Sequence, residues 1–160
     1  MLSAPLSSLA GKLDVRDGAW QLNFNNADRT VSYSFKGKKM LDGVFSTALD
    51  PSEVLLDTRK YPDVELRKQK INDEFGKGTK YTYIYSGLPG RENIEQATYV
   101  YPSLPYILVE TTLVAEQGTT SSTNICPIVS ETSVELPIGE GDNRVYNMPF
   151  ANDNWATFHA

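Results

Sequence analysis

The chain lacks the side chains from which most catalytic and metal centres are built. Its 160 residues include one cysteine, Cys126, and one histidine, His159. A single cysteine excludes an internal disulfide and a C-x-x-C metal site. The single imidazole lies at the end of the chain, a poor position for a Ser–His–Asp or Cys–His relay, and a zinc site is equally short of ligands. We therefore expect no catalytic residue, metal or cofactor in this chain, and we expect Cys126 to be a buried structural thiol.

The chain also has no basic excess and no long hydrophobic run. Its net charge is −5 with no basic stripe that could neutralise phosphates, which argues against a nucleic-acid partner. The basic residues 67–70 are followed at once by Asp73 and Glu74, as is typical of a solvated strand face. No window approaches the ~18 apolar residues of a membrane span. Residues 1–10 lack the basic start and apolar core of a signal peptide, so none is predicted.

What the chain does have is alternation of apolar and polar residues, the pattern of β-strands. Residues 20–24 and 31–35 alternate on either side of a turn at 25–28, which predicts an antiparallel hairpin. Further strands are predicted at 40–47, 81–85, 94–101, 106–115, 122–130, 132–137 and 144–148.

Residues 64–75 allow two interpretations, because their apolar residues fit either one helical face or an alternating strand. We favour a strand, since the following turn leads directly into residues 81–85. Gly76 and Gly78 can both supply the positive φ of a tight connection. Residues 49–62 look irregular, with a helical turn near the start and a loop at the end.

These short strands predict an all-β protein, an antiparallel β-sandwich of about ten or more strands. A chain of 160 residues fits a single domain that buries roughly 70% of its unfolded surface. We expect the core to include Trp20, Phe35, Tyr83 and Val109.

Two groups of residues resemble functional sites but are better explained by structure. Residues 81, 83 and 85 are tyrosines on one strand face, which favours core packing over an exposed aromatic platform. Paired carboxylates could serve sugar hydrolysis, but the acids here lie beside turns, where they usually bond the backbone. These acids are Asp14 with Asp17, Asp73 with Glu74, and Glu140 with Asp142.

The strongest binding candidate is the segment Asn152, Asp153, Asn154 and Trp155. Amide and carboxylate groups can match sugar hydroxyls while an indole stacks on an apolar sugar face. A structural alternative is an Asx-rich loop whose Trp155 packs on the sandwich rim. A calcium site in this segment, or at residues 142–143, lacks the spacing of an EF-hand loop.

Three stretches together resemble a known family: residues 72–81, residues 99–110 and residues 142–155. They are similar to the N-terminal β-sandwich of bacterial alpha-galactosidase and raffinose-synthase-like glycoside hydrolases, which are common in gut Bacteroidetes. The resemblance covers about residues 11–158. The Pro-Phe-x-Asn-Asp-x-Trp-like ending is its most specific motif.

The resemblance implies a galactose-mutarotase-like super-sandwich that precedes a catalytic (β/α)8 barrel in a periplasmic or extracellular parent protein. The catalytic aspartates of that family lie in the barrel. Residues 1–160 would then be a single non-catalytic domain, the N-terminal part of a longer protein. The segment 152–155 would lie at the rim of the sugar pocket.

Three functional hypotheses remain open on the sequence. The first is a non-catalytic domain that packs on the barrel of the same parent chain and shapes its pocket for a galactoside or other glycan. The second is a free-standing carbohydrate-binding module. The third is a structural or adhesion-type sandwich that binds protein.

Overall fold

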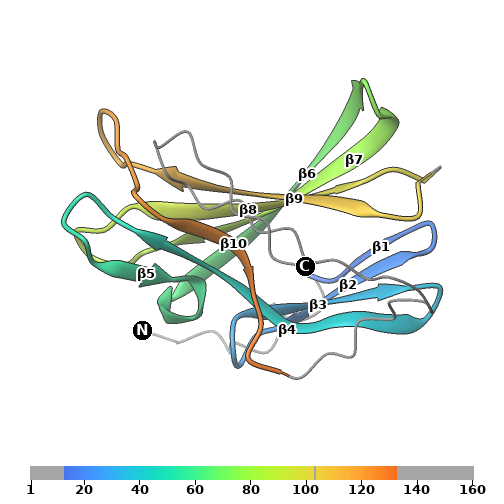
Figure 1. Cartoon of the computed structure of the whole chain (residues 1–160), viewed down its shortest axis with the longest axis horizontal. Helices are drawn as coiled ribbons and strands as arrows, with labels where there is room; N and C mark the ends of the chain where they lie inside the picture. The colour runs from blue at the N-terminus through green and yellow to red at the C-terminus, as the bar shows by residue number, and fades with distance from the viewer. Residues whose placement is uncertain (1–12, 103, 133–160) are drawn as a thin grey trace, which may run out of the picture.

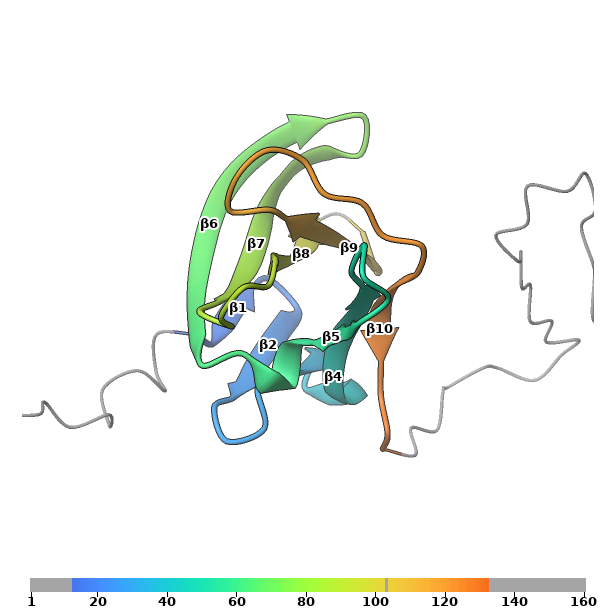
Figure 2. The same ribbon diagram turned by 90° about the vertical axis from the view of Figure 1, so that its left-hand side faces the viewer.

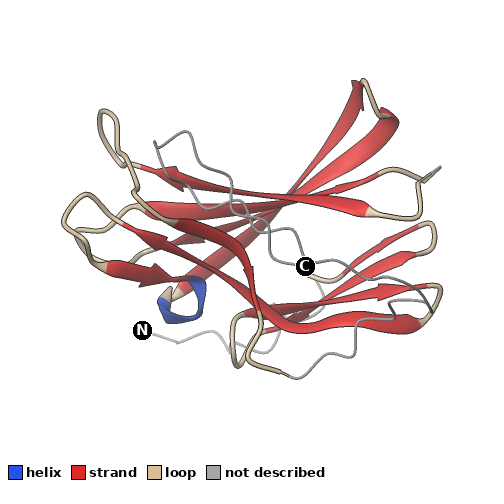
Figure 3. Cartoon of the chain, in the orientation of Figure 1, coloured by secondary structure: helices blue, strands red, loops and turns tan. Residues whose placement is uncertain are grey.

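Two antiparallel β-sheets pack face to face to form a β-sandwich (Figure 1). The computed structural model describes residues 13–102 and 104–132. Strands account for nearly all of its regular structure, as Figure 3 shows. In chain order the elements are β1 (Val15–Asp17), β2 (Trp20–Asn25), β3 (Thr30–Phe35), β4 (Lys38–Leu49), β5 (Leu55–Asp57), the 3-10 helix η2 (Thr58–Lys60), β6 (Asp63–Asp73), β7 (Gly76–Ser86), β8 (Asn93–Val100), β9 (Ile107–Val114) and β10 (Ile125–Val129).

One sheet has the order β1-β2-β3-β4-β10, with β5 also paired to β4, and the other has the order β6-β7-β8-β9. The predicted hairpin is confirmed, with Trp20 opposite Phe35 and Leu22 opposite Tyr33. The strand interpretation of residues 64–75 is also confirmed, because β6 pairs with β7 along its whole length. In the described part of the chain, no helix has the length and apolar character needed to cross a membrane. The predicted strands at 132–137 and 144–148 fall almost entirely outside the described residues.

The interior of the protein lies between two layers, one formed by β6 to β9 and the other by β2, β4 and β5. Figure 2 shows the two layers from the side. The tyrosines of β7 point into it, and Tyr83 is fully buried, which confirms the core interpretation. Trp20 is buried as predicted. Phe35 and Val109 are only half-buried, contrary to expectation, because Phe35 ends its strand beside a turn and Val109 lies on the edge strand β9.

Tyrosine hydroxyls tie the two sheets together across this interior. Tyr33 Oη lies 3.1 Å from Thr98 Oγ1, and Tyr83 Oη donates to the carbonyl oxygen of Leu13 at 2.7 Å. Tyr81 Oη donates to Asp17 Oδ2 at 2.8 Å. These bonds satisfy hydroxyls that would be costly to bury alone. Burial raises the pKa of Tyr33 to about 12.

Three details differ from the sequence expectation. Gly76 has a positive φ of 103°, but Gly78 does not, and its small size serves packing instead. The irregular segment 49–62 contains β5 and η2, with Asp57 Oδ1 accepting the Arg59 backbone N–H at 2.9 Å. Cys126 is only half-buried rather than buried, because β10 is the edge strand of its sheet.

Candidate functional site

The segment predicted to contact carbohydrate, Asn152, Asp153, Asn154 and Trp155, lies outside the described residues. Its role therefore stays a prediction. The same holds for the acid pair Glu140 and Asp142 and for the alternative calcium sites. The fold does place the other candidates.

Asp14, Asp17 and Asp73 bond the framework of the fold, as expected for carboxylates beside turns. Asp14 Oδ1 accepts the Phe24 backbone N–H at 2.8 Å, joining β2 to the segment before β1. Asp73 Oδ1 accepts the Phe75 backbone N–H at 2.9 Å and fixes the β6–β7 turn. These contacts give Asp14 and Asp73 a structural role.

The two described stretches that support the resemblance, residues 72–81 and 99–110, pack against each other. The first forms the turn between β6 and β7, and the second runs from β8 into β9. Tyr101 Oη donates to Asp73 Oδ2 at 2.7 Å, and the rings of Phe75 and Tyr101 lie 5.7 Å apart, tilted to each other. We call the surface formed by these two stretches the hairpin end. Its first stretch lies at the turn where β6 and β7 extend past the other strands in Figure 1.

Gly78 allows this close packing. A Cβ atom at this position would lie 2.7 Å from Tyr101 Cδ1 and 2.7 Å from the Val100 carbonyl oxygen, so any larger residue would force the two stretches apart. Burial, together with the hydrogen bond to Asp73, raises the pKa of Tyr101 to about 12. The Tyr101 side chain is therefore a fixed, neutral part of the hairpin end at physiological pH.

A second cluster, made of Lys80, Tyr99 and Glu110, links the same stretches. The Tyr99 hydroxyl donates to Glu110, and Lys80 Nζ lies 3.4 Å from Glu110 Oε2 and 4.9 Å from the Tyr99 ring centre. The Tyr99 hydrogen bond, with a further contribution from the Lys80 charge, holds the pKa of Glu110 below its ordinary value. Glu110 thus remains an ionised anchor rather than a proton donor at neutral pH.

A concavity of about 450 Å³ lies beside the hairpin end, with Lys70 and Asp17 in its walls. Lys70 Nζ donates to Thr79 Oγ1 at 2.9 Å, and Asp17 accepts the Tyr81 hydroxyl. Both charged groups are thus engaged within the fold. The concavity is therefore a shaped surface whose Lys70 and Asp17 side chains already bond within the fold.

The exposed side of the hairpin end combines apolar and charged groups. Phe75 is 40% exposed and Tyr106 is 45% exposed. The hairpin end itself holds two basic and three acidic side chains, and the adjoining residues 67–71 of β6 add three basic ones. Exposed aromatic residues within a charged rim are typical of surfaces that contact another protein or domain.

In the part of the chain that the structure describes, no three His, Cys, Asp or Glu side chains lie close enough together to hold a metal ion.

Comparison with known proteins found no matching family model, no matching curated protein and no matching solved structure. The functional argument therefore rests on this chain's own residues and geometry.

Sequence reasoning did not foresee the contact between Asp73 and Tyr101. Strand register is the signal that could have revealed this contact. Thr79 of β7 pairs with Val100 of β8, which places the β6–β7 turn beside the connection between β8 and β9. That register follows from the alternation of both strands once they are aligned.

Proposed function

We propose that this chain is a non-catalytic β-sandwich domain of an alpha-galactosidase-like glycoside hydrolase, and that its hairpin end packs on the catalytic barrel of the same parent protein. The observation that supports the proposal is the convergence of residues 72–81 and 99–110 on one surface. The register of β7 and β8 places these two stretches side by side, and the exposed side chains that they contribute to one surface support a shared role.

The chemistry of the hairpin end supports contact with another domain. Phe75 offers an apolar anchor, and the Tyr101 ring beneath it holds it in place. The three basic side chains of the adjoining residues 67–71 suit a partner surface of negative charge, because complementary charges orient two domains during docking. The edge strand β6 contains the run 67–70 with three basic residues, which discourages pairing with a further strand.

The reading frame of the natural gene tests this proposal. We expect a barrel-length extension after Ala160 with aspartates at the ends of its strands. The parent protein should then hydrolyse alpha-galactosides, while residues 1–160 alone should not. A stop codon directly after Ala160 would contradict the proposal.

A free-standing carbohydrate-binding module is the second candidate, because the segment 152–155 combines amide and carboxylate groups with an indole. Calorimetric titration of residues 1–160 with galactose and raffinose tests it. Weak affinity that is lost in Trp155→Ala would support a module that binds through the segment 152–155. Flat heats at millimolar sugar would count against a module of any kind. A protein-binding adhesion sandwich predicts neither sugar affinity nor an extension after Ala160.

A further inference from the structure

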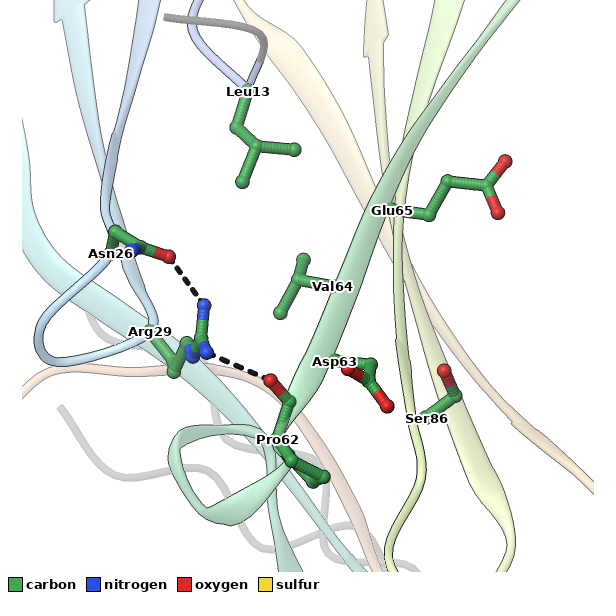
Figure 4. Close-up of a pocket in the computed structure, with 8 residues that line it drawn as sticks. All are labelled: Leu13, Asn26, Arg29, Pro62, Asp63, Val64, Glu65 and Ser86. Carbon is green, nitrogen blue, oxygen red and sulfur yellow. Dashed lines mark hydrogen bonds between the residues drawn. The ribbon is translucent and has the colours of Figure 1, made fainter. Parts of the chain in front are cut away.

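We infer that residues 9–12, which directly precede the first described residue, dock in a cleft at the open edge of β6 and close that side of the sandwich. The cleft has a volume of about 390 Å³. It lies between the β2–β3 turn, which contributes Arg29, and the start of β6 (Figure 4). The inferred occupant is a segment of this chain, and the inference is independent of the proposed function.

The connection to Leu13 brings this segment to the cleft. Leu13 is buried and lines the cleft, and Figure 4 shows its side chain on the same side of β6 as Val64. The Tyr83 hydroxyl fixes the Leu13 backbone by donating to its carbonyl oxygen at 2.7 Å. Four extended residues reach at most about 14 Å, and residues 63–66 of β6 span roughly 13 Å. Residues 9–12 are therefore long enough to cover the first part of β6.

The edge of β6 is protected over only part of its length. β6 pairs with β7 alone, so its other edge has no strand partner among residues 13–102 and 104–132. A bare edge invites pairing with another chain, and basic side chains are one means of preventing it. Residues 67–70 supply three basic side chains, whereas residues 63–66 supply none. A segment docked along residues 63–66 would protect the part of the edge that lacks basic side chains.

Arg29 offers hydrogen-bond donors to such a segment. Its guanidinium donates to Asn26 Oδ1 and, at 2.8 Å, to the carbonyl oxygen of Pro62, which holds it beside the start of β6. A guanidinium has five N–H donors, so three have no partner in the described part of the chain. No carboxylate forms an ion pair with Arg29 there. The backbone carbonyl oxygens of residues 9–12 are neutral acceptors that suit these donors.

The charge of the segment complements the outer face of β6. Asp63 and Glu65 are exposed and point away from Arg29, as Figure 4 shows. Neither carboxylate forms an ion pair with any of the described residues. Residues 9–12 contain one basic side chain, Lys12, and no acidic one. A segment that lies along this edge would bring the Lys12 charge close to two carboxylates.

The other side chains of the segment suit the apolar side of the cleft. Leu13 and Val64 form this side, and Val64 is only half-buried. Leu9 would cover the exposed part of Val64 and remove further apolar surface from water. Ala10 and Gly11 are small, which lets the backbone lie close to the strand.

Nuclear magnetic resonance relaxation of residues 1–160 tests the inference. We expect backbone order parameters of about 0.85 for residues 9–12, the value of rigid backbone, and nuclear Overhauser contacts between the methyl groups of Leu9 and Val64. Order parameters below about 0.6, the range of flexible backbone, or Leu9 contacts with other elements only, would overturn the inference. Ordering that appears only as the protein concentration rises would indicate a second copy at this edge and would equally overturn it.

Arg29→Gly removes the donors at a position where glycine suits the backbone, since φ is 55° there. We expect the order parameters of residues 9–12 to fall below about 0.6 while β2 and β3 stay folded. Lys36→Gly is a matched control, because Lys36 also has a positive φ, 49°, and one positive charge but lies in the β3–β4 turn. Equal order parameters in the two variants would overturn the inference.

Leu9→Ser tests the docking without changing any described residue. We expect the order parameters of residues 10–12 to fall below about 0.6, because the segment loses its apolar contact with Val64. Leu2→Ser is the control, since it removes the same side chain outside the docked residues. The same order parameters in both variants would overturn the inference even if Arg29→Gly failed to fold.

Discussion

The two parts of the β6–β7 hairpin differ sharply although they belong to the same pair of strands. The proximal part, residues 63–66 with 81–86, contributes Tyr83 and Tyr85 to the core. The distal part, residues 67–80, extends past the sandwich, with basic side chains along it and Phe75 at its turn. The β6 side chains that face the other sheet are apolar before Lys68 and become basic at Lys68, near the point where β1 ends.

This difference teaches that one long hairpin can serve two purposes. Its proximal part is fixed by burial and by hydrogen bonds to the opposite sheet. Its distal part has local supports only, namely the packing of Gly78 and Asp73 against Tyr101 and the contact of Lys80 with Glu110. The proximal part therefore sets the stability of the isolated chain, and the distal part is free to contact a partner.

Tyr83→Ala should cause the largest loss of stability, because it empties the centre of the proximal part. Truncating a buried aromatic side chain costs about 4 kcal/mol. Chemical denaturation followed by tryptophan fluorescence measures the change. Tyr83→Phe is the control that keeps the ring and loses only the bond to Leu13, at about 1 kcal/mol. A loss below about 1 kcal/mol in Tyr83→Ala would show that the proximal part is not the core.

Gly78→Ala should destabilise the chain by about 2 kcal/mol, as expected when an added methyl group overpacks a close contact. The added Cβ would push against the Tyr101 ring and the Val100 carbonyl group. Lys77→Ala, on an exposed neighbouring residue, should change the free energy of unfolding by less than about 0.5 kcal/mol. Equal effects of the two variants would contradict the assigned role of Tyr101 in supporting the distal part.

Alkaline pH should destabilise the fold through the buried tyrosines. The pKa of Tyr33 is raised from 10.0 to about 12 in the folded chain, mainly by burial. Because the folded pKa is the higher one, this stabilisation is complete below pH 10 and is lost as the pH rises toward 12. Absorbance at 295 nm, recorded with circular dichroism, should show these tyrosines ionising together with unfolding. Ionisation of all nine tyrosines near pH 10 in a folded protein would contradict their burial.

Phe75→Ser should have the smallest effect on the isolated chain, about 1 kcal/mol or less, because the ring is already 40% exposed. In the parent protein it should weaken domain contact and lower the melting temperature further. Val54→Ser is a matched control, since Val54 is 38% exposed but lies before β5, outside the hairpin end. Similar effects of both variants in the parent protein would argue against docking through Phe75.

The sequence predicted the strands well because alternation is a local property. The β2–β3 hairpin followed from the spacing of its own apolar residues, whereas the strand at 64–75 followed from the adjacent turn, because its apolar spacing also fitted a helix. Two features did not follow: the pairing of β10 with β4 and the partial exposure of Cys126 that results from it. Each depends on segments far apart in the chain, and local patterns contain no information on which distant strands become neighbours.

Hydrogen exchange in the isolated chain and in the parent protein tests the central claim most directly. If the distal part of the hairpin docks on the catalytic barrel, the amides of residues 71–78 should exchange at least tenfold more slowly in the parent protein. Those of residues 81–85, already buried in the sandwich, should exchange equally in both. Equal exchange of residues 71–78 in the two proteins would contradict the account.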